Sequence, residues 1–228
     1  MSHIFDFDRY FHQSLVSSHS YDRLKAFVND EDAIRAHIAN NELYFDRTER
    51  HVARLKIQFS QTVNLYGNQM VVFYCTILDS MVENFFYSIF VSKPERLKEF
   101  FASNGELKDR LGFSLNNFLE SESKEAYVQD LSKNAANLCT EGGPKKYIKK
   151  IKKITGSNLS EVDTKMLEEL YDTRNKIVHD NQMYKFSSDD LFVYGETVSD
   201  VLGELYDKLK ELGIEVKEDF IKSVVDED

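Results

Sequence analysis

The sequence predicts an all-α protein, on three observations. Turn-forming residues are scarce, with 9 glycines and 2 prolines among 228 residues, fewer than an all-β fold of this length needs. Apolar residues recur at helical spacing in several segments, and helix-capping motifs open the later ones. Hydrophobic residues make up 42% and charged residues 30% of the chain, a composition typical of a domain with a buried core.

The first 66 residues are expected to form an N-terminal helical region that packs on the core. Its first 28 residues are rich in aromatic side chains and are expected to include a short helix or an arm packed on the body. Residues 30–66 predict one long helix, or two helices broken near Asn40, because apolar residues repeat there at three- and four-residue steps: Val52, Leu55, Phe59 and Val63. Gly67-Asn68 is a typical helix stop.

Residues 67–213 are expected to form the main helical bundle, which begins with the most apolar stretch of the chain. Met70–Val91 is apolar almost all round, as is typical of a long central helix buried on every side. A membrane span is the alternative interpretation. Asp79 and Glu83 lie in the middle of this stretch, however, and each carboxylate there would cost about 3 kcal/mol of insertion free energy. We therefore expect no membrane partner.

Breaks in the pattern divide the rest of the bundle. Lys93-Pro94 ends the apolar helix, and a short helix is expected over Glu95–Ala102. A more polar region with a weaker helical pattern extends to Thr140. Gly142-Gly143-Pro144 then marks a clear break before a lysine-rich segment.

Two capping motifs place the last two helices. Ser160 and Asp163 have the spacing of a capping box, in which Ser160 caps the helix and Asp163 reaches back. Ser187–Asp190 has the same form and predicts a final amphipathic helix closed by Gly213. Residues 214–228 are expected to be an acidic tail, and the whole chain one compact unit.

The sequence argues against several classes of site. The two cysteines, Cys75 and Cys139, are far apart and lack metal-ligand spacing, so we expect no metal and no cofactor. The first residues lack the basic start and apolar run of a signal peptide, which favours a cytoplasmic protein with reduced thiols. No phosphate-binding glycine loop and no Gly-x-Ser-x-Gly elbow is present.

Charge constrains any nucleic-acid partner. The net charge of −10 repels phosphates at long range, so RNA or DNA would have to meet a local basic patch. Six lysines within nine residues supply a candidate, and apolar residues between them predict a helix with one packed face: Lys145, Lys146, Lys149, Lys150, Lys152 and Lys153. The patch could contact RNA phosphates, could be a solvated helix face that balances nearby acids, or could bind a membrane surface.

One basic residue lies on the apolar face of the penultimate predicted helix, residues 160–181. On an ideal helix Arg174 falls near the centre of the apolar stripe, where an unpaired charge is costly. It therefore needs a carboxylate, an anionic ligand or a wet cleft at a subunit boundary. Asn175 and His179 are four residues apart and share one flank of the helix. About 140° of helix rotation separates Arg174 from His179. A core arginine paired with an acid is the simpler alternative.

The segment Arg174-Asn175-Lys176-Ile177-Val178-His179 resembles the signature of the HEPN superfamily, in which four residues separate an arginine from a histidine and a polar residue follows the arginine. The helix order is also similar, over roughly Met70 to Leu212. The apolar helix with Asp79 and Glu83 resembles the HEPN core helix that carries a supporting acid. The likeness is strongest to stand-alone HEPN proteins of prokaryotic defence and toxin–antitoxin loci.

This resemblance implies an HEPN-like bundle with an N-terminal elaboration, acting as a metal-independent endoribonuclease. It implies a homodimer with a composite active site, RNA as substrate, and an antitoxin or defence protein as a possible partner. His179 would transfer protons and Arg174 would hold the phosphate. Asn175 would orient either His179 or the scissile phosphate. Glu83 and Asp79 would orient Arg174, or would form a purely structural ion pair.

Two other functions fit the same residues. One is a non-catalytic HEPN module that binds a nucleotide, RNA or a partner protein, and the other is a structural dimerisation protein. The chain also departs from some HEPN toxins, which carry a tyrosine two residues after the histidine as a target for antitoxin modification. Asn181 occupies that position and the nearest tyrosine is Tyr184, so control by that route is not expected.

Overall fold

The structure, a computed structural model, describes residues 4–40, 49–102, 110, 114–160 and 162–219. Helices account for most of these residues, which confirms the all-α class. The elements are β1 (Phe5–Asp6), α1 (Phe7–Asn29), α2 (Glu31–Asn40), α3 (Glu49–Ser92), α4 (Pro94–Ala102), α6 (Leu115–Glu120), α7 (Lys124–Thr140), α8 (Pro144–Thr155), α9 (Thr164–His179), α10 (Ser188–Glu211) and β2 (Val216–Lys217).

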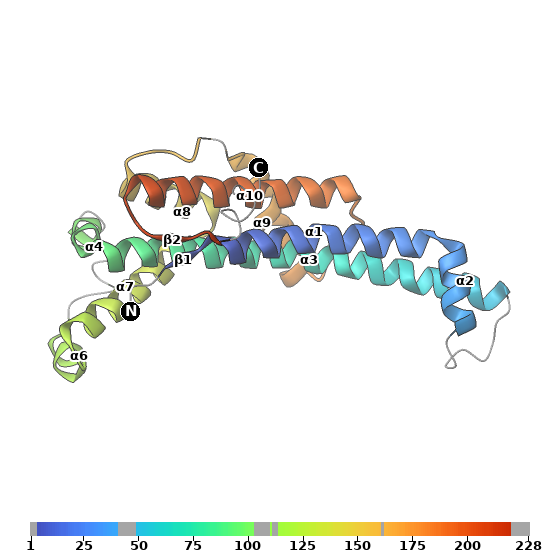
Figure 1. Cartoon of the computed structure of the whole chain (residues 1–228), viewed down its shortest axis with the longest axis horizontal. Helices are drawn as coiled ribbons and strands as arrows, with labels where there is room; N and C mark the ends of the chain where they lie inside the picture. Colours follow the sequence, from blue (N-terminus) through green and yellow to red (C-terminus); the bar gives the residue numbers. More distant parts are fainter. Residues whose placement is uncertain (1–3, 41–48, 103–109, 111–113, 161, 220–228) are drawn as a thin grey trace.

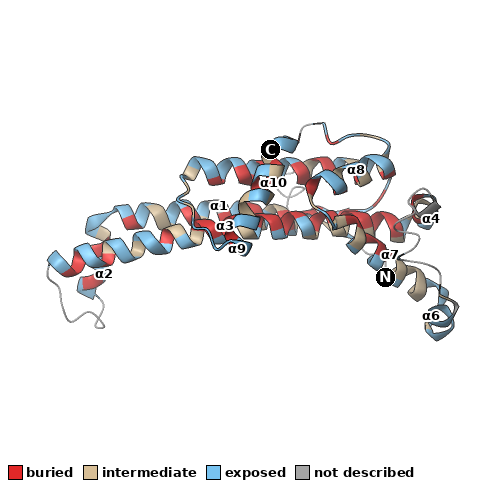
Figure 2. Cartoon of the chain, turned by 180° about the vertical axis from the view of Figure 1, so that it is seen from behind, coloured by how far each residue is buried: buried red, intermediate tan, exposed pale blue. Residues whose placement is uncertain are grey.

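The helices form an elongated bundle along α3, the longest described helix. In Figure 1, α1 and α10 run beside α3, α2 lies at one end, and α4 and α6 lie at the other. Figure 2 shows buried residues gathered along the half of α3 that α7, α9 and α10 cover. Within the described residues, no helix combines the length and the apolar character that crossing a bilayer requires.

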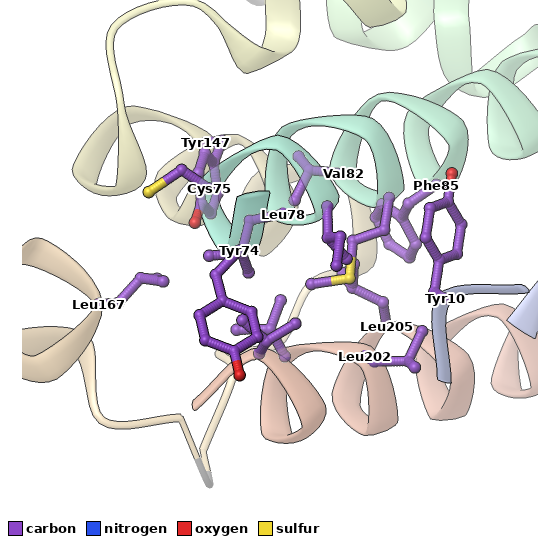
Figure 3. Packing of buried hydrophobic residues seen from close by; sticks show 14 of the residues in the cluster. Tyr10, Tyr74, Cys75, Leu78, Val82, Phe85, Tyr147, Leu167, Leu202 and Leu205 are labelled. Atoms are coloured by element: carbon purple, nitrogen blue, oxygen red, sulfur yellow. The ribbon is translucent and has the colours of Figure 1, made fainter. Parts of the chain in front are cut away.

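The core forms where α3 meets α1, α7, α9 and α10. Figure 3 shows Tyr74, Leu78 and Phe85 of α3 facing side chains of α10, with Leu167 of α9 nearby. These side chains are excluded from water. Burial of each such large apolar side chain contributes about 1.5–3 kcal/mol, so this seam fixes α9 on the bundle.

The predicted stop at Gly67-Asn68 was wrong, because α3 runs unbroken from Glu49 to Ser92. A glycine inside a helix costs only about 1 kcal/mol, which the packing around α3 outweighs. The boundary expected between residues 66 and 67 therefore falls inside one helix. The break expected near Asn40 lies at the end of α2, and residues 41–48 are outside the described residues.

The N-terminal expectation underestimated α1, which is a helix of 23 residues and not a short arm. β1 before it pairs in parallel with β2, so that Phe5 lies opposite Val216. Ile214 and Val216 are buried, so the segment expected to be an acidic tail begins as a packed part of the protein. Residues 220–228 of that segment are outside the described residues.

One capping prediction was wrong and the other is confirmed. Helix α9 begins at Thr164 with Asp163 as its cap, which accepts from the backbone of Lys165 and Met166. The hydroxyl and backbone N–H of Ser160 instead donate to Glu204 Oε1, at 3.0 and 2.7 Å. Ser160 is thus drawn away from α9 by α10.

The second predicted capping box does form at the start of α10. Ser187 accepts from the N–H of Asp190, and the Asp190 carboxylate accepts from the N–H of Ser187. The predicted breaks at Pro94 and Gly142-Gly143-Pro144 are confirmed as well, since α4 and α8 begin at the two prolines.

Candidate functional site

The candidate site lies on α9, which two polar contacts and the core seam hold against α3. The Tyr171 hydroxyl donates to Asp79 Oδ1 at 2.6 Å, and the Cys75 thiol lies 3.9 Å from the carbonyl oxygen of Leu170. The sequence places Tyr171 only in the apolar stripe, and nothing in its spacing indicates the hydrogen bond. Both contacts precede the Arg174 motif by one helical turn, so the motif begins on a fixed support.

Arg174 is partly exposed, although by helix rotation it lies between the buried positions Leu167 and Leu170. The buried residues of α9 are Leu167, Leu170 and Ile177, whereas Val178 is 47% exposed. The buried stripe therefore contains fewer residues than the distribution of apolar residues suggests, and Arg174 is half-buried on it. Its Nη1 donates to the side-chain oxygen of Asn175 at 3.1 Å.

No carboxylate among the described residues lies within ion-pair distance of Arg174. Asp79 is close enough for the Arg174 charge to favour its ionised form. Asp79 is exposed as a residue, but its carboxylate is partly desolvated where it meets Tyr171. This desolvation is the largest effect and raises the pKa of Asp79, whereas the Tyr171 hydrogen bond and the Arg174 charge act to lower it. Most of the donor capacity of the guanidinium is therefore available to an anion.

Glu83 is not brought to Arg174. Its carboxylate faces α7. There the amide nitrogen of Asn137 donates to both Glu83 oxygens at 2.6 and 3.1 Å, when the amide is in the orientation that satisfies both groups. Burial raises the pKa of Glu83, and the positive charge of Lys133, which lies on α7, acts to lower it. Of the two acids expected to support the motif, only Asp79 lies beside α9.

Asn175 and His179 are both exposed on the outer flank of α9. His179 is the last residue of the helix, and its ring makes no hydrogen bond to any described residue. An exposed imidazole one turn beyond Asn175 is accessible to a ligand that contacts the Arg174–Asn175 pair.

The lysine-rich segment forms α8, as predicted, with its lysines in two rows. In the row toward α9, Lys145 pairs with Glu168 at 2.8 Å. In the other row, Lys150 donates to the carbonyl oxygens of Leu138 and Cys139 at 2.7 and 3.0 Å, at the end of α7. Its ammonium thus satisfies helix carbonyls that would otherwise lack a donor.

The remaining lysines of α8 differ in their availability. Lys153 lies over the Phe100 ring at 5.8 Å. Lys146, Lys149 and Lys152 are exposed and form no ion pair with a described residue. The basic surface that α8 offers to a ligand therefore rests on these three residues, while Lys145, Lys150 and Lys153 also have structural contacts.

A cavity of about 300 Å³ joins the start of α8 to the flank of α9. Its lining includes Gly143, Lys145, Tyr171 and Asn175, with Glu168 and Asp172 as acidic walls. Gly143 caps α8 without a side-chain hydrogen bond. Pro144 has no N–H, and the N–H groups of Lys146 and Tyr147 donate to the Gly143 carbonyl, so the Lys145 N–H is the donor left at this end of α8. The lysine helix and the motif helix thus border one cavity, an arrangement that the sequence could not predict.

No protein-family model, curated protein or solved structure matches this chain.

Proposed function

We propose that this chain is a metal-independent endoribonuclease of the HEPN type, a toxin or an antiviral defence effector. The observation that carries the proposal is the half-buried Arg174, which has no described carboxylate in ion-pair distance and lies five residues before the exposed His179. A cation held in this way can bind a phosphate through two donors, and an exposed imidazole can transfer protons to and from a bound ligand.

The chemistry requires two proton transfers. The RNA 2′-oxygen attacks the adjacent phosphorus, a base accepts the 2′-hydroxyl proton, and the bond from phosphorus to the 5′-oxygen breaks as an acid protonates that oxygen. The products are a 2′,3′-cyclic phosphate and a 5′-hydroxyl. Arg174 would stabilise the charge on the non-bridging oxygens, and the requirement for a 2′-hydroxyl selects RNA over DNA.

In this proposal His179 supplies one of the two transfers, and a second copy of the chain supplies the other histidine. Asn175, which accepts from Arg174, would set the orientation of the guanidinium. Asp79 would support the arginine from α3, and Lys146, Lys149 and Lys152 would guide the RNA backbone. The free, buried thiols of Cys75 and Cys139 support a reducing, cytoplasmic setting.

A non-catalytic HEPN module that binds a nucleotide, RNA or protein is the second candidate. It is favoured by the single histidine at this site: among the described residues, one copy offers His179 and no second imidazole beside it. One copy could therefore bind a phosphate without cleaving RNA.

The deciding experiment is incubation of the purified chain with total RNA and tRNA in excess EDTA, with end-group analysis of the fragments. His179→Ala is the test variant, and His12→Ala, the control, removes another exposed histidine, on α1. Fragments with 2′,3′-cyclic phosphate ends from wild type and His12→Ala, but not from His179→Ala, are expected. A folded dimer that leaves every RNA intact would refute the nuclease, and RNA binding lost in Arg174→Ala would then favour the binding module.

A further inference from the structure

A second cavity lies on the opposite flank of α9, between that helix, the segment 181–187 and the start of α10. Its volume is about 410 Å³, within the range of small-molecule sites, about 300–1,000 Å³. The lining includes Glu169 of α9, the rings of Tyr184 and Phe186, and Asp189 and Tyr194 of α10. None of these residues belongs to the proposed nuclease site.

The aromatic wall of this cavity is built from three rings in contact. Tyr184 and Phe186 stack with ring centroids 5.8 Å apart, and Tyr194 meets Phe186 edge-on at 6.3 Å. Aromatic faces carry negative charge density and attract cations, most strongly where water is partly excluded. A ring wall with aliphatic neighbours such as Val193 also suits the methylene stem of a ligand.

The charged side chains of the cavity also favour a cation. Three carboxylates, Glu169, Asp189 and Asp190, line it against one ammonium, Lys185. Glu169 and Asp189 form no ion pair with a described residue. Asp190 is tied to the capping box of α10, whose hydrogen bonds lower the pKa of its carboxyl and keep it ionised. Carboxylates beside aromatic faces favour an organic cation over an anion or a neutral molecule.

The segment that carries the rings is held in place before any ligand binds. Asn68 of α3 hydrogen-bonds both backbone groups of Tyr184, and the Tyr21 hydroxyl donates to the Phe186 carbonyl at 2.9 Å. A preformed pocket loses less conformational entropy on binding. These anchors therefore favour binding of a small ligand.

We propose that this cavity, named here the Tyr184 pocket, binds an organic cation with an aliphatic stem, an alkylguanidinium or alkylammonium group. The group would lie between the rings and the carboxylates of Glu169 and Asp189. Its source is either a free metabolite of this chemistry or the arginine side chain of a partner protein.

Isothermal titration calorimetry on the full chain at low ionic strength tests the proposal. Agmatine serves as the free guanidinium, N-butylurea as its neutral counterpart, and acetyl-Gly-Arg-Gly-amide as the peptide source. The test variants are Glu169→Gln with Asp189→Asn, and separately Tyr184→Leu. The matched control, Asp200→Asn with Asp207→Asn, removes the same charge at exposed positions of α10 outside both cavities.

Agmatine is expected to bind wild type and the matched control with a Kd of about 1 mM or lower. N-butylurea should bind wild type at least about tenfold more weakly than agmatine does, and agmatine should bind either test variant at least about tenfold more weakly than it binds wild type. Binding of the peptide alone, with the same losses in the variants, would assign the pocket to a partner's arginine. The proposal is overturned if neither cation binds, or if the test variants and the matched control weaken binding equally. RNA cleavage plays no part in this readout.

Discussion

Asn68 holds the backbone of Tyr184 through both ends of its amide. Its Nδ2 donates to the Tyr184 carbonyl at 2.8 Å, and its Oδ1 accepts from the Tyr184 N–H at 3.0 Å. Asn68 is wholly buried and lies in the middle of α3, 116 residues away in sequence. One side chain thus fixes the segment between α9 and α10, and with it the aromatic wall of the Tyr184 pocket.

Asn68→Ala should destabilise the protein strongly. It would leave the partly buried N–H and carbonyl of Tyr184 without the Asn68 side chain as partner, at about 1–3 kcal/mol for each unsatisfied group. We expect a loss of about 2–4 kcal/mol in the free energy of unfolding, measured by urea denaturation, and faster hydrogen exchange at the Tyr184 amide. Gln69→Ala, at the exposed neighbouring position, should change stability by less than about 0.5 kcal/mol. Equal losses in the two variants would contradict this assignment.

Two glycine substitutions should have opposite consequences. A Cβ at Gly203 of α10 meets no atom within 4 Å, so Gly203→Ala should stabilise the protein by about 1 kcal/mol through helix propensity. A Cβ at Gly67 would lie 3.2 Å from Tyr21 Cε2 and 3.4 Å from Phe186 Cδ2, so Gly67→Ala should lose that gain or reverse it. Thermal denaturation of both variants measures the difference, and an equal rise in Tm would show that the rings move aside without cost.

Asp79 should make stability fall as the pH rises above the ordinary carboxyl range. Burial raises its pKa in the folded protein, so between the unfolded and folded pKa values the folded state binds more protons, and stability declines with rising pH. Asp79→Asn keeps an oxygen that can accept from Tyr171 and removes the titration. The free energy of unfolding of both proteins is measured from about pH 3 to about pH 8. As the pH rises, wild type should lose stability relative to Asp79→Asn. A constant difference would refute the raised pKa.

The lysines of α8 should separate into structural and ligand-binding residues. Lys150→Met removes the donor to the α7 carbonyls and should cost about 1–3 kcal/mol of stability, whereas Lys149→Met should cost less than about 0.5 kcal/mol. Urea denaturation measures both effects. Comparable losses would mean that the hydrogen bonds from Lys150 to α7 contribute little in solution.

The exposed lysines should contribute to RNA binding by neutralising phosphates. Replacing Lys146, Lys149 and Lys152 with glutamine should weaken binding of single-stranded RNA and reduce the slope of log K against log salt by about 0.7 for each phosphate that is no longer neutralised. Fluorescence anisotropy at several salt concentrations measures the slope. An unchanged slope would show that α8 is only a solvated helix face. The control for net charge is the triple replacement of three exposed lysines of other helices with glutamine: Lys98, Lys124 and Lys165.

Local sequence signals determined the class of structure and several boundaries. The scarcity of glycine and proline predicted helices, and the starts of α4, α8 and α10 follow from prolines and a capping box whose partners are three residues apart. These features need no distant contact, because the backbone geometry of a few neighbouring residues fixes them. The sequence also placed Arg174, Asn175 and His179 on one helix, since i to i+4 spacing follows from the helical repeat alone.

Tertiary structure decided the features that depend on distant residues. Gly67 and Asn68 have the local form of a helix stop, yet α3 continues through them because the glycine admits the rings of Tyr21 and Phe186 and the asparagine binds Tyr184. Asp79 rather than Glu83 lies beside the motif, since only the docking of α9 determines which turn of α3 it meets. Local propensity is worth about 1 kcal/mol or less at each such position, whereas a buried side chain and its hydrogen bonds are worth several times more, so packing prevails where the two conflict.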